Sequence, residues 1–140
     1  MNRLKQIALS LALLFAVGAA SAQVKFNDVS TKQLYAMANE SKKLVFIDIY
    51  ASWCPPCKAM DRDVFSKAEL GKFMAQHFVC AKYDIDGGVG KQIAQTHGIS
   101  SIPTYLIFDA KGNKLGTLAG YMNEATFKNN INAVLKNIKK

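Results

Sequence analysis

Two cysteines mark the segment of this chain with the clearest chemical potential, Trp-Cys-Pro-Pro-Cys-Lys at residues 53–58. Cys54 and Cys57 are separated by two residues. At this spacing, thiols can form a structural disulfide, supply half of a metal site, or act as a redox pair. These three kinds of site require different residues in the surrounding chain, so the neighbouring sequence can distinguish between them.

A zinc site would need two further ligands, and His77 and Cys80 have the spacing of a second ligand pair. Cys80 lies in an apolar segment that is predicted to be a strand, where a cysteine commonly packs in the core. The two prolines also remove backbone N–H groups that would support thiolate ligands. A haem-attachment motif needs a histidine directly after the cysteine pair, where Lys58 stands. We therefore expect no metal, no cofactor, and a core position for Cys80.

A structural disulfide is disfavoured because a bridge that closes so short a loop removes little entropy from the unfolded chain. The cysteine pair follows a predicted strand and begins a helical pattern. Pro55 and Pro56 are tolerated in a first helical turn, where backbone N–H groups have no partners. Cys54 would then lie at the helix N-terminus, where the helix dipole favours a thiolate, and Cys57 one turn further in. We expect an exposed nucleophile at Cys54 and a sheltered, resolving thiol at Cys57.

Asp48 lies six residues before Cys54, inside the apolar run at residues 46–49. Burying a carboxylate without a partner is costly and raises its pKa. Two interpretations remain open from spacing alone. Asp48 is either paired with a neighbour or turned to solvent, or it is a proton donor and acceptor near the resolving thiol.

The remaining patterns predict one α/β domain that positions these residues. Predicted helices cover residues 29–39, 54–65, 66–78, 89–97 and the segment after 123, and predicted strands cover 44–50, 78–85, 104–108 and 114–119. Ser66 and Glu69 have the spacing of a capping box, Gly98 is placed to end a helix, and Asn123 can cap the last one. A βαβ unit followed by a ββα unit gives a mixed sheet with helices on both faces.

Residues 1–22 have the three parts of a secretory signal peptide. Two basic residues precede an apolar run that ends at Ala20, and the sequence Ala-Ser-Ala then provides a cleavage pattern. The run is short for a membrane span, which needs about 20 residues, although an uncleaved membrane anchor is the alternative. We expect cleavage of residues 1–22, export to a bacterial periplasm, and a mature domain at residues 23–140 that is not inserted in the membrane.

Charge and cysteine content exclude other classes. The net charge is +8, but the basic residues are scattered and do not alternate with aromatic ones, so we expect no nucleic-acid binding. The cysteines number three, an odd count and too few for a domain held together by disulfides. We expect a monomer.

The residues described above resemble the thioredoxin family. The matching features are Asp48, the block at residues 51–58, the segment 81–86, the segment 97–104 ending in Ile-Pro-Thr, and Gly120. The resemblance covers nearly all of residues 23–140. It implies a thioredoxin fold, a central mixed β-sheet flanked by helices on both faces, with a cis peptide bond before Pro103. Two features depart from cytoplasmic thioredoxin, which has Gly-Pro between its cysteines where this chain has Pro-Pro. The second is the expanded segment 60–78, which looks more like secreted thioredoxin-like proteins and the soluble domains of bacterial thiol:disulfide interchange proteins.

The resemblance also implies an activity, that of a protein-disulfide oxidoreductase. Cys54 would attack a disulfide in a partner protein, and Cys57 would resolve the mixed disulfide. Asp48 would handle the Cys57 proton, tuned by Lys82. The implied partners are proteins with disulfides and an upstream thiol:disulfide electron donor.

Substrate contacts are implied for Trp53, Ile102, Pro103 and Gly120. The cis Pro103 would leave the Ile102 backbone free to pair with an extended substrate segment. Tyr121 and Met122 could extend the apolar rim of this substrate contact. Isoleucine before Pro103 resembles reductive members, which favours a reductase or interchange role. The alternatives are a disulfide-forming oxidase or isomerase, and a non-catalytic binding module.

Overall fold

The computed structural model describes residues 23–140, and the predicted signal peptide lies outside the described residues. The elements in chain order are α1 (Thr31–Ser41), β1 (Leu44–Tyr50), α2 (Pro55–Met60), the π-helix η1 (Asp61–Phe65), α3 (Ala68–His77), β2 (Phe78–Asp84), α4 (Gly88–His97), β3 (Thr104–Phe108), β4 (Lys114–Ala119) and α5 (Glu124–Ile138). Within residues 23–140, no helix is long and apolar enough to cross a membrane.

The four strands of this region form one mixed sheet in the order β2-β1-β3-β4. β1 and β2 run parallel, whereas β3 is antiparallel to both of its neighbours. The parallel pair is joined by a helical crossover, as parallel strands require. β1 is a central strand covered on both faces, which explains why its sequence is almost continuously apolar. The predicted α/β fold class is confirmed.

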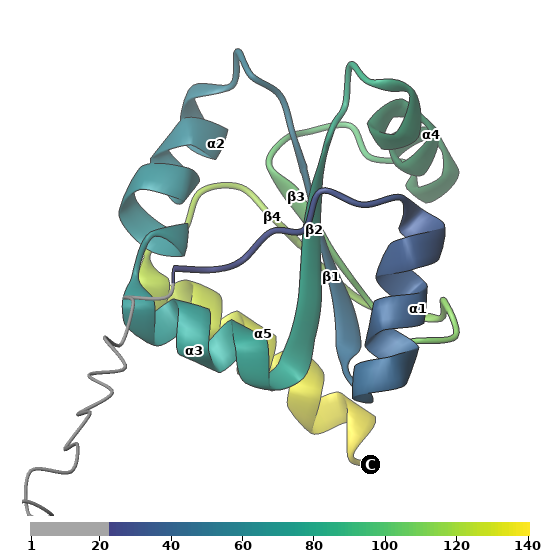
Figure 1. Ribbon diagram of the computed structural model, residues 1–140. Coiled ribbons are helices and arrows are strands. Elements are labelled where there is room, and N and C mark those ends of the chain that lie inside the picture. Colours follow the sequence, from purple (N-terminus) through teal and green to yellow (C-terminus); the bar gives the residue numbers. More distant parts are fainter. Residues whose placement is uncertain (1–22) are drawn as a thin grey trace, which may run out of the picture.

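Helices cover both faces of the sheet (Figure 1). α2, η1, α3 and α5 pack on one face, and α1 and α4 pack on the other. Successive side chains of a strand point to opposite faces, so β1 contributes to both layers. Phe46 packs with the first group of helices, whereas Val45 and Ile47 pack with Leu34 from α1. Asp48 has the same parity as Phe46, so it faces the side covered by α2 and η1.

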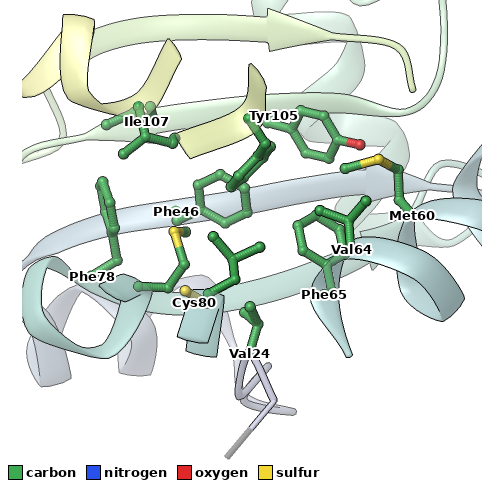
Figure 2. Packing of buried hydrophobic residues seen from close by; sticks show 13 residues of the cluster. Val24, Phe46, Met60, Val64, Phe65, Phe78, Cys80, Tyr105 and Ile107 are labelled. Atoms are coloured by element: carbon green, nitrogen blue, oxygen red, sulfur yellow. The ribbon is translucent and has the colours of Figure 1, made fainter. Parts of the chain in front are cut away.

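Phe46 is the centre of the aromatic core on that face. Four rings have centroids 5.8–6.4 Å from the Phe46 ring, those of Phe65, Phe78, Tyr105 and Phe127. These rings belong to η1, β2, β3 and α5, so one side chain connects four elements with the central strand. Cys80 lies in the same buried cluster (Figure 2), as predicted. Burial raises the pKa of the Cys80 thiol to about 12.

Helix termini show where local prediction succeeded and failed. Gly98 ends α4 in the left-handed region with φ 63°, and the Asn123 side chain caps α5, both as predicted. The predicted capping box at Ser66 is wrong. α3 begins after Lys67 without a side-chain cap, and the Ser66 hydroxyl instead donates to the carbonyl of Arg62, because the π-helix extends to Phe65 directly before it.

Candidate active site

The cysteine pair lies where β1 leads into α2, at the upper end of the sheet in Figure 1. Cys54 is the N-cap residue of α2, and the two prolines occupy its first two helical positions, as predicted. Cys54 and Cys57 form a disulfide, with 5.3 Å between their Cα atoms. The backbone N–H of Cys57 donates to Sγ of Cys54 at 3.3 Å. The first turn of α2 therefore directs an amide dipole at the sulfur of Cys54.

Solvent exposure does not distinguish the two cysteines. Cys54 is 3% exposed and Cys57 is 4% exposed, so the predicted exposure of Cys54 is wrong for the disulfide form. The reason is that Ile85 and Ile102, from other loops, pack against the small cluster that Cys54 forms with Ala51 and Cys57. The difference between the two sulfurs lies in their surroundings, because the Cys57 amide is hydrogen-bonded to Sγ of Cys54.

The loop before β3 lies directly against the disulfide. The Ile102–Pro103 peptide bond is cis, and the carbonyl oxygen of Ile102 lies 3.9 Å from Sγ of Cys54. The N–H of Gly120, which has φ 86°, donates to the carbonyl of Pro103 at 2.8 Å. The structure thus brings Ile102 to Cys54 and Gly120 to Pro103, although these residues are far apart in the sequence.

Trp53 stands beside the pair with its ring turned outward. Its side chain belongs to the exposed large hydrophobic residues, at 63% exposure, together with Tyr121. The indole Nε1–H donates to the carboxylate of Asp86 at 2.7 Å, and the backbone N–H of Asp86 donates to the side chain of Asp84. Trp53 therefore has a fixed polar contact and a free apolar surface next to the disulfide.

Asp48 is buried, with an exposed fraction of 2%. Its register partners are Lys82 on β2 and Tyr105 on β3. One carboxylate oxygen lies 3.9 Å from the Lys82 ammonium, and the other has no hydrogen-bond partner among the described residues. Burial raises the pKa of Asp48 to about 7, since the loss of hydration outweighs the attraction of Lys82 and the nearby charge of Asp61 adds to the rise. Asp48 is therefore not turned to solvent.

Lys82 has a second acidic partner that sequence reasoning missed. Its ammonium lies 2.8 Å and 2.9 Å from the two carboxylate oxygens of Asp61. It also lies 4.4 Å from the centroid of the Tyr50 ring and 5.2 Å from that of Phe26. The signal for Asp61 was present, because it stands four residues after Cys57 and such residues share a helix face.

Tyr105 is the other neighbour that the sequence did not reveal. It stands opposite Asp48 in the antiparallel pairing of β1 and β3, and burial raises the pKa of its phenol. Among residues 23–140, no group of three or more His, Cys, Asp or Glu side chains lies close enough together to hold a metal ion, and His77 and Cys80 are not gathered with the cysteine pair in such a group.

Comparison with known proteins identifies the family. Residues 31–135 match the family described as "Thioredoxin-like domain". The match includes the cysteine pair, Asp48, Lys82, Pro103 and Gly120, and it extends over far more than half of the chain.

Two groups of named relatives are similar to this chain. It is 30% identical over 104 residues to the thiol:disulfide interchange protein DsbD of Colwellia psychrerythraea, which covers 71% of this chain but 17% of that protein. It is 37% identical over 94 residues to thioredoxin H4 of Arabidopsis thaliana, covering 67% of this chain and 73% of that protein. The chain therefore spans less than a fifth of the DsbD relative and most of the plant thioredoxin.

Solved structures share the fold at lower sequence identity. A putative disulphide-isomerase from Bacteroides thetaiotaomicron has a TM-score of 0.74 at 24% identity, over 81% of this chain and 94% of that one. A thioredoxin from Thermus thermophilus has a TM-score of 0.71 at 20% identity, over 81% and 88% of the two chains. These likenesses show the overall fold.

Proposed function

Because the chain belongs to the thioredoxin-like domain family, we propose that it is an exported thiol:disulfide oxidoreductase that reduces or exchanges disulfides in partner proteins. The observation that carries this proposal is the Cys54–Cys57 disulfide at the start of α2. The buried carboxylate of Asp48 lies near the end of β1, the strand that leads into this helix.

The first step is attack by reduced Cys54. Its thiolate forms a bond to one sulfur of the partner's disulfide, and the partner's other sulfur leaves as a thiolate and takes up a proton. The amide of Cys57, which donates to Sγ of Cys54, supports negative charge on that sulfur. The start of α2 acts in the same direction through its dipole.

The second step is resolution by Cys57. Asp48 takes the proton of the Cys57 thiol, and the Cys57 thiolate attacks Sγ of Cys54 and displaces the partner's sulfur as a thiolate. This second thiolate takes up the proton from Asp48, which returns to its carboxylate form, and the first one takes its proton from solvent. The chain has then lost two electrons and closed its disulfide, while the partner has gained two electrons and two protons. A carboxyl whose pKa is about 7 is suited to this transfer because both of its protonation states are populated at neutral pH.

Substrate binding is proposed for the surface around the disulfide. Ile102, which precedes Pro103, lies against Cys54, and the exposed ring of Trp53 belongs to the residue directly before Cys54. The Ile102 backbone would pair with an extended segment of the partner, as in strand addition. Gly120, hydrogen-bonded to the carbonyl of Pro103, would leave room for that segment because it has no side chain.

Export and electron supply complete the proposal. Residues 1–22 would be removed as a signal peptide, and the mature monomer of residues 23–140 would work in the periplasm, where another thiol:disulfide protein would re-reduce it. Intact-mass measurement of secreted material tests the cleavage. A mature chain that begins at Gln23 is expected, and retention of residues 1–22 would contradict it.

Insulin-disulfide reduction by the mature protein, with dithiothreitol as electron source, tests the activity. Wild type should accelerate the reduction, the Cys54→Ser variant should not, and the Cys80→Ala variant should match wild type because Cys80 is a core residue. Equal rates for wild type and Cys54→Ser would refute the redox function.

Equilibration of the pair with thiol buffers separates the reductase from its alternatives. A potential close to that of thioredoxin, about −270 mV, supports the reductase, whereas a value near −120 mV indicates a disulfide-forming oxidase. A pair that no thiol buffer opens indicates a non-catalytic binding module. We expect the reducing value, because Ile102 before Pro103 resembles reductive members of the family.

A further inference from the structure

Lys82 stands between two carboxylates and contacts them unequally. Its ammonium forms two close contacts with Asp61, at 2.8 Å and 2.9 Å, but lies 3.9 Å from the nearest oxygen of Asp48. Asp61 is half-exposed, whereas Asp48 is buried and keeps one oxygen without a partner in the described part of the chain. The Lys82 ammonium is therefore closer to the hydrated carboxylate of Asp61 than to the buried carboxylate of Asp48.

Two features hold Lys82 in that place. Its ammonium lies over the rings of Tyr50 and Phe26, and such contacts favour a fixed position for a cation. Asp61 begins η1, directly after the helix that carries Cys57, so its backbone position is set by the helix that also holds the redox pair. The Asp61–Lys82 contact thus connects the cysteine helix with the strand beside Asp48.

We propose that Asp61 is a positioning residue that holds the Lys82 ammonium away from Asp48 and so leaves the Asp48 carboxylate basic enough to take the Cys57 proton. This inference rests on the proposed function, in which Asp48 is the proton acceptor. A cation placed directly on Asp48 would stabilise the carboxylate form and reduce its affinity for the proton.

The surroundings of Asp48 support this assignment. The groups that act on it electrostatically are Lys82 from β2, Asp61 from η1 and Tyr105 from β3. The pKa of Asp48 is raised by burial, lowered by Lys82 and raised again by Asp61, so Asp61 opposes the effect of the lysine. The side chains that α3 and α5 contribute to the core of this face are apolar, and the cysteines have no titrating proton in the disulfide form.

Titration of the Asp48 carboxyl carbon by NMR, in the oxidised protein, tests the inference without catalysis. In the Asp61→Asn variant, Lys82 keeps its ring contacts but loses its closest carboxylate, and we expect its ammonium to shorten the 3.9 Å distance to Asp48. At an effective dielectric constant near 20, this should lower the Asp48 midpoint by about one pH unit. Asp61→Glu retains the carboxylate and should stay close to wild type. Asp63→Asn is the matched control. It also removes one negative charge, two residues after Asp61, but the Asp63 carboxylate pairs with Arg62 and not with Lys82.

The Lys82→Met background distinguishes positioning from direct repulsion between the two acids. If Asp61 acts by holding Lys82, the effect of Asp61→Asn on the Asp48 midpoint should fall to less than half when Lys82 is absent. Equal effects in the two backgrounds would overturn the inference, as would an unchanged midpoint in Asp61→Asn itself.

Insulin reduction measured as a function of pH provides the second readout. The midpoint of the rate profile in Asp61→Asn should move to lower pH together with the Asp48 titration, and Asp61→Glu should restore it. If wild type shows no reduction that depends on Cys54, the proposed function fails. If wild type is active but Asp61→Asn keeps both midpoints, only the inference about Asp61 fails.

Discussion

The buried carboxylate of Asp48 makes the stability of the oxidised protein depend on pH, and the Asp48→Asn variant isolates this dependence. The asparagine side chain has nearly the same shape as aspartate but carries no titrating group. The pKa of Asp48 is 3.8 in the absence of burial and about 7 in the folded protein. At pH values below 3.8 the carboxyl is protonated in both the folded and the unfolded state, so ionisation carries no penalty there.

The penalty develops as the pH rises. Above 3.8 the unfolded chain releases the Asp48 proton while the folded protein keeps it, so the unfolded state is increasingly favoured until the pH reaches about 7. A difference of about three pH units at 1.36 kcal/mol each amounts to about 4 kcal/mol. This is a large share of the ~5–15 kcal/mol by which domains are ordinarily stable.

Urea unfolding of the oxidised proteins between pH 4 and pH 8 measures this effect. The free energy of unfolding of Asp48→Asn minus that of wild type should rise by about 4 kcal/mol across this range and level off above pH 7. Glu40→Gln, which neutralises an exposed acid on α1, is the control and should follow wild type within about 0.5 kcal/mol. A constant difference would refute the assignment, and a falling difference would mean that Lys82 outweighs the cost of burial.

Two further predictions concern the core. Cys80 is buried and its thiol has a pKa of about 12, so it should not react with iodoacetamide at pH 8 in the native, oxidised protein. Intact mass should show no adduct for the native protein and one adduct in urea. Rapid labelling of the native protein would contradict the core position of Cys80. Phe46→Ala removes the ring that connects η1, β2, β3 and α5 and should lower the free energy of unfolding by about 3–5 kcal/mol in urea titration, whereas a loss below about 1 kcal/mol would show that this ring is not central.

The strands of this fold were predictable because their signal is local. The boundaries of β1, β3 and β4 agree with those expected, since each is an apolar or β-branched run that ends at turn-forming residues. The position of Cys54 at the N-terminus of α2 was predictable because proline fits the first helical turn, and Pro55 and Pro56 follow Cys54. Such features depend on a few neighbouring residues, so they can be predicted from the sequence without knowledge of the tertiary structure.

The parts that escaped prediction depend on which strands and helices meet. Tyr105 faces Asp48 only because β3 lies next to β1 in the sheet, and the sequence does not specify that order. Asp61 meets Lys82 only because residues 21 positions apart in the chain come together in the fold, and the π-helical turn that begins at Asp61 is not what local propensity predicts. The burial of Cys54 arises from the loop that contains Ile102, which is distant in the sequence.

The roles of the two cysteines form the central claim, and trapping of the mixed disulfide tests them most directly. Reduced Cys57→Ser protein, in a Cys80→Ala background, is mixed with a disulfide-bonded peptide, and the covalent adduct is located by peptide mapping. The account predicts a stable adduct on Cys54 and a far slower reaction for the corresponding Cys54→Ser protein. Equal or faster adduct formation at Cys57 in the Cys54→Ser protein would contradict it.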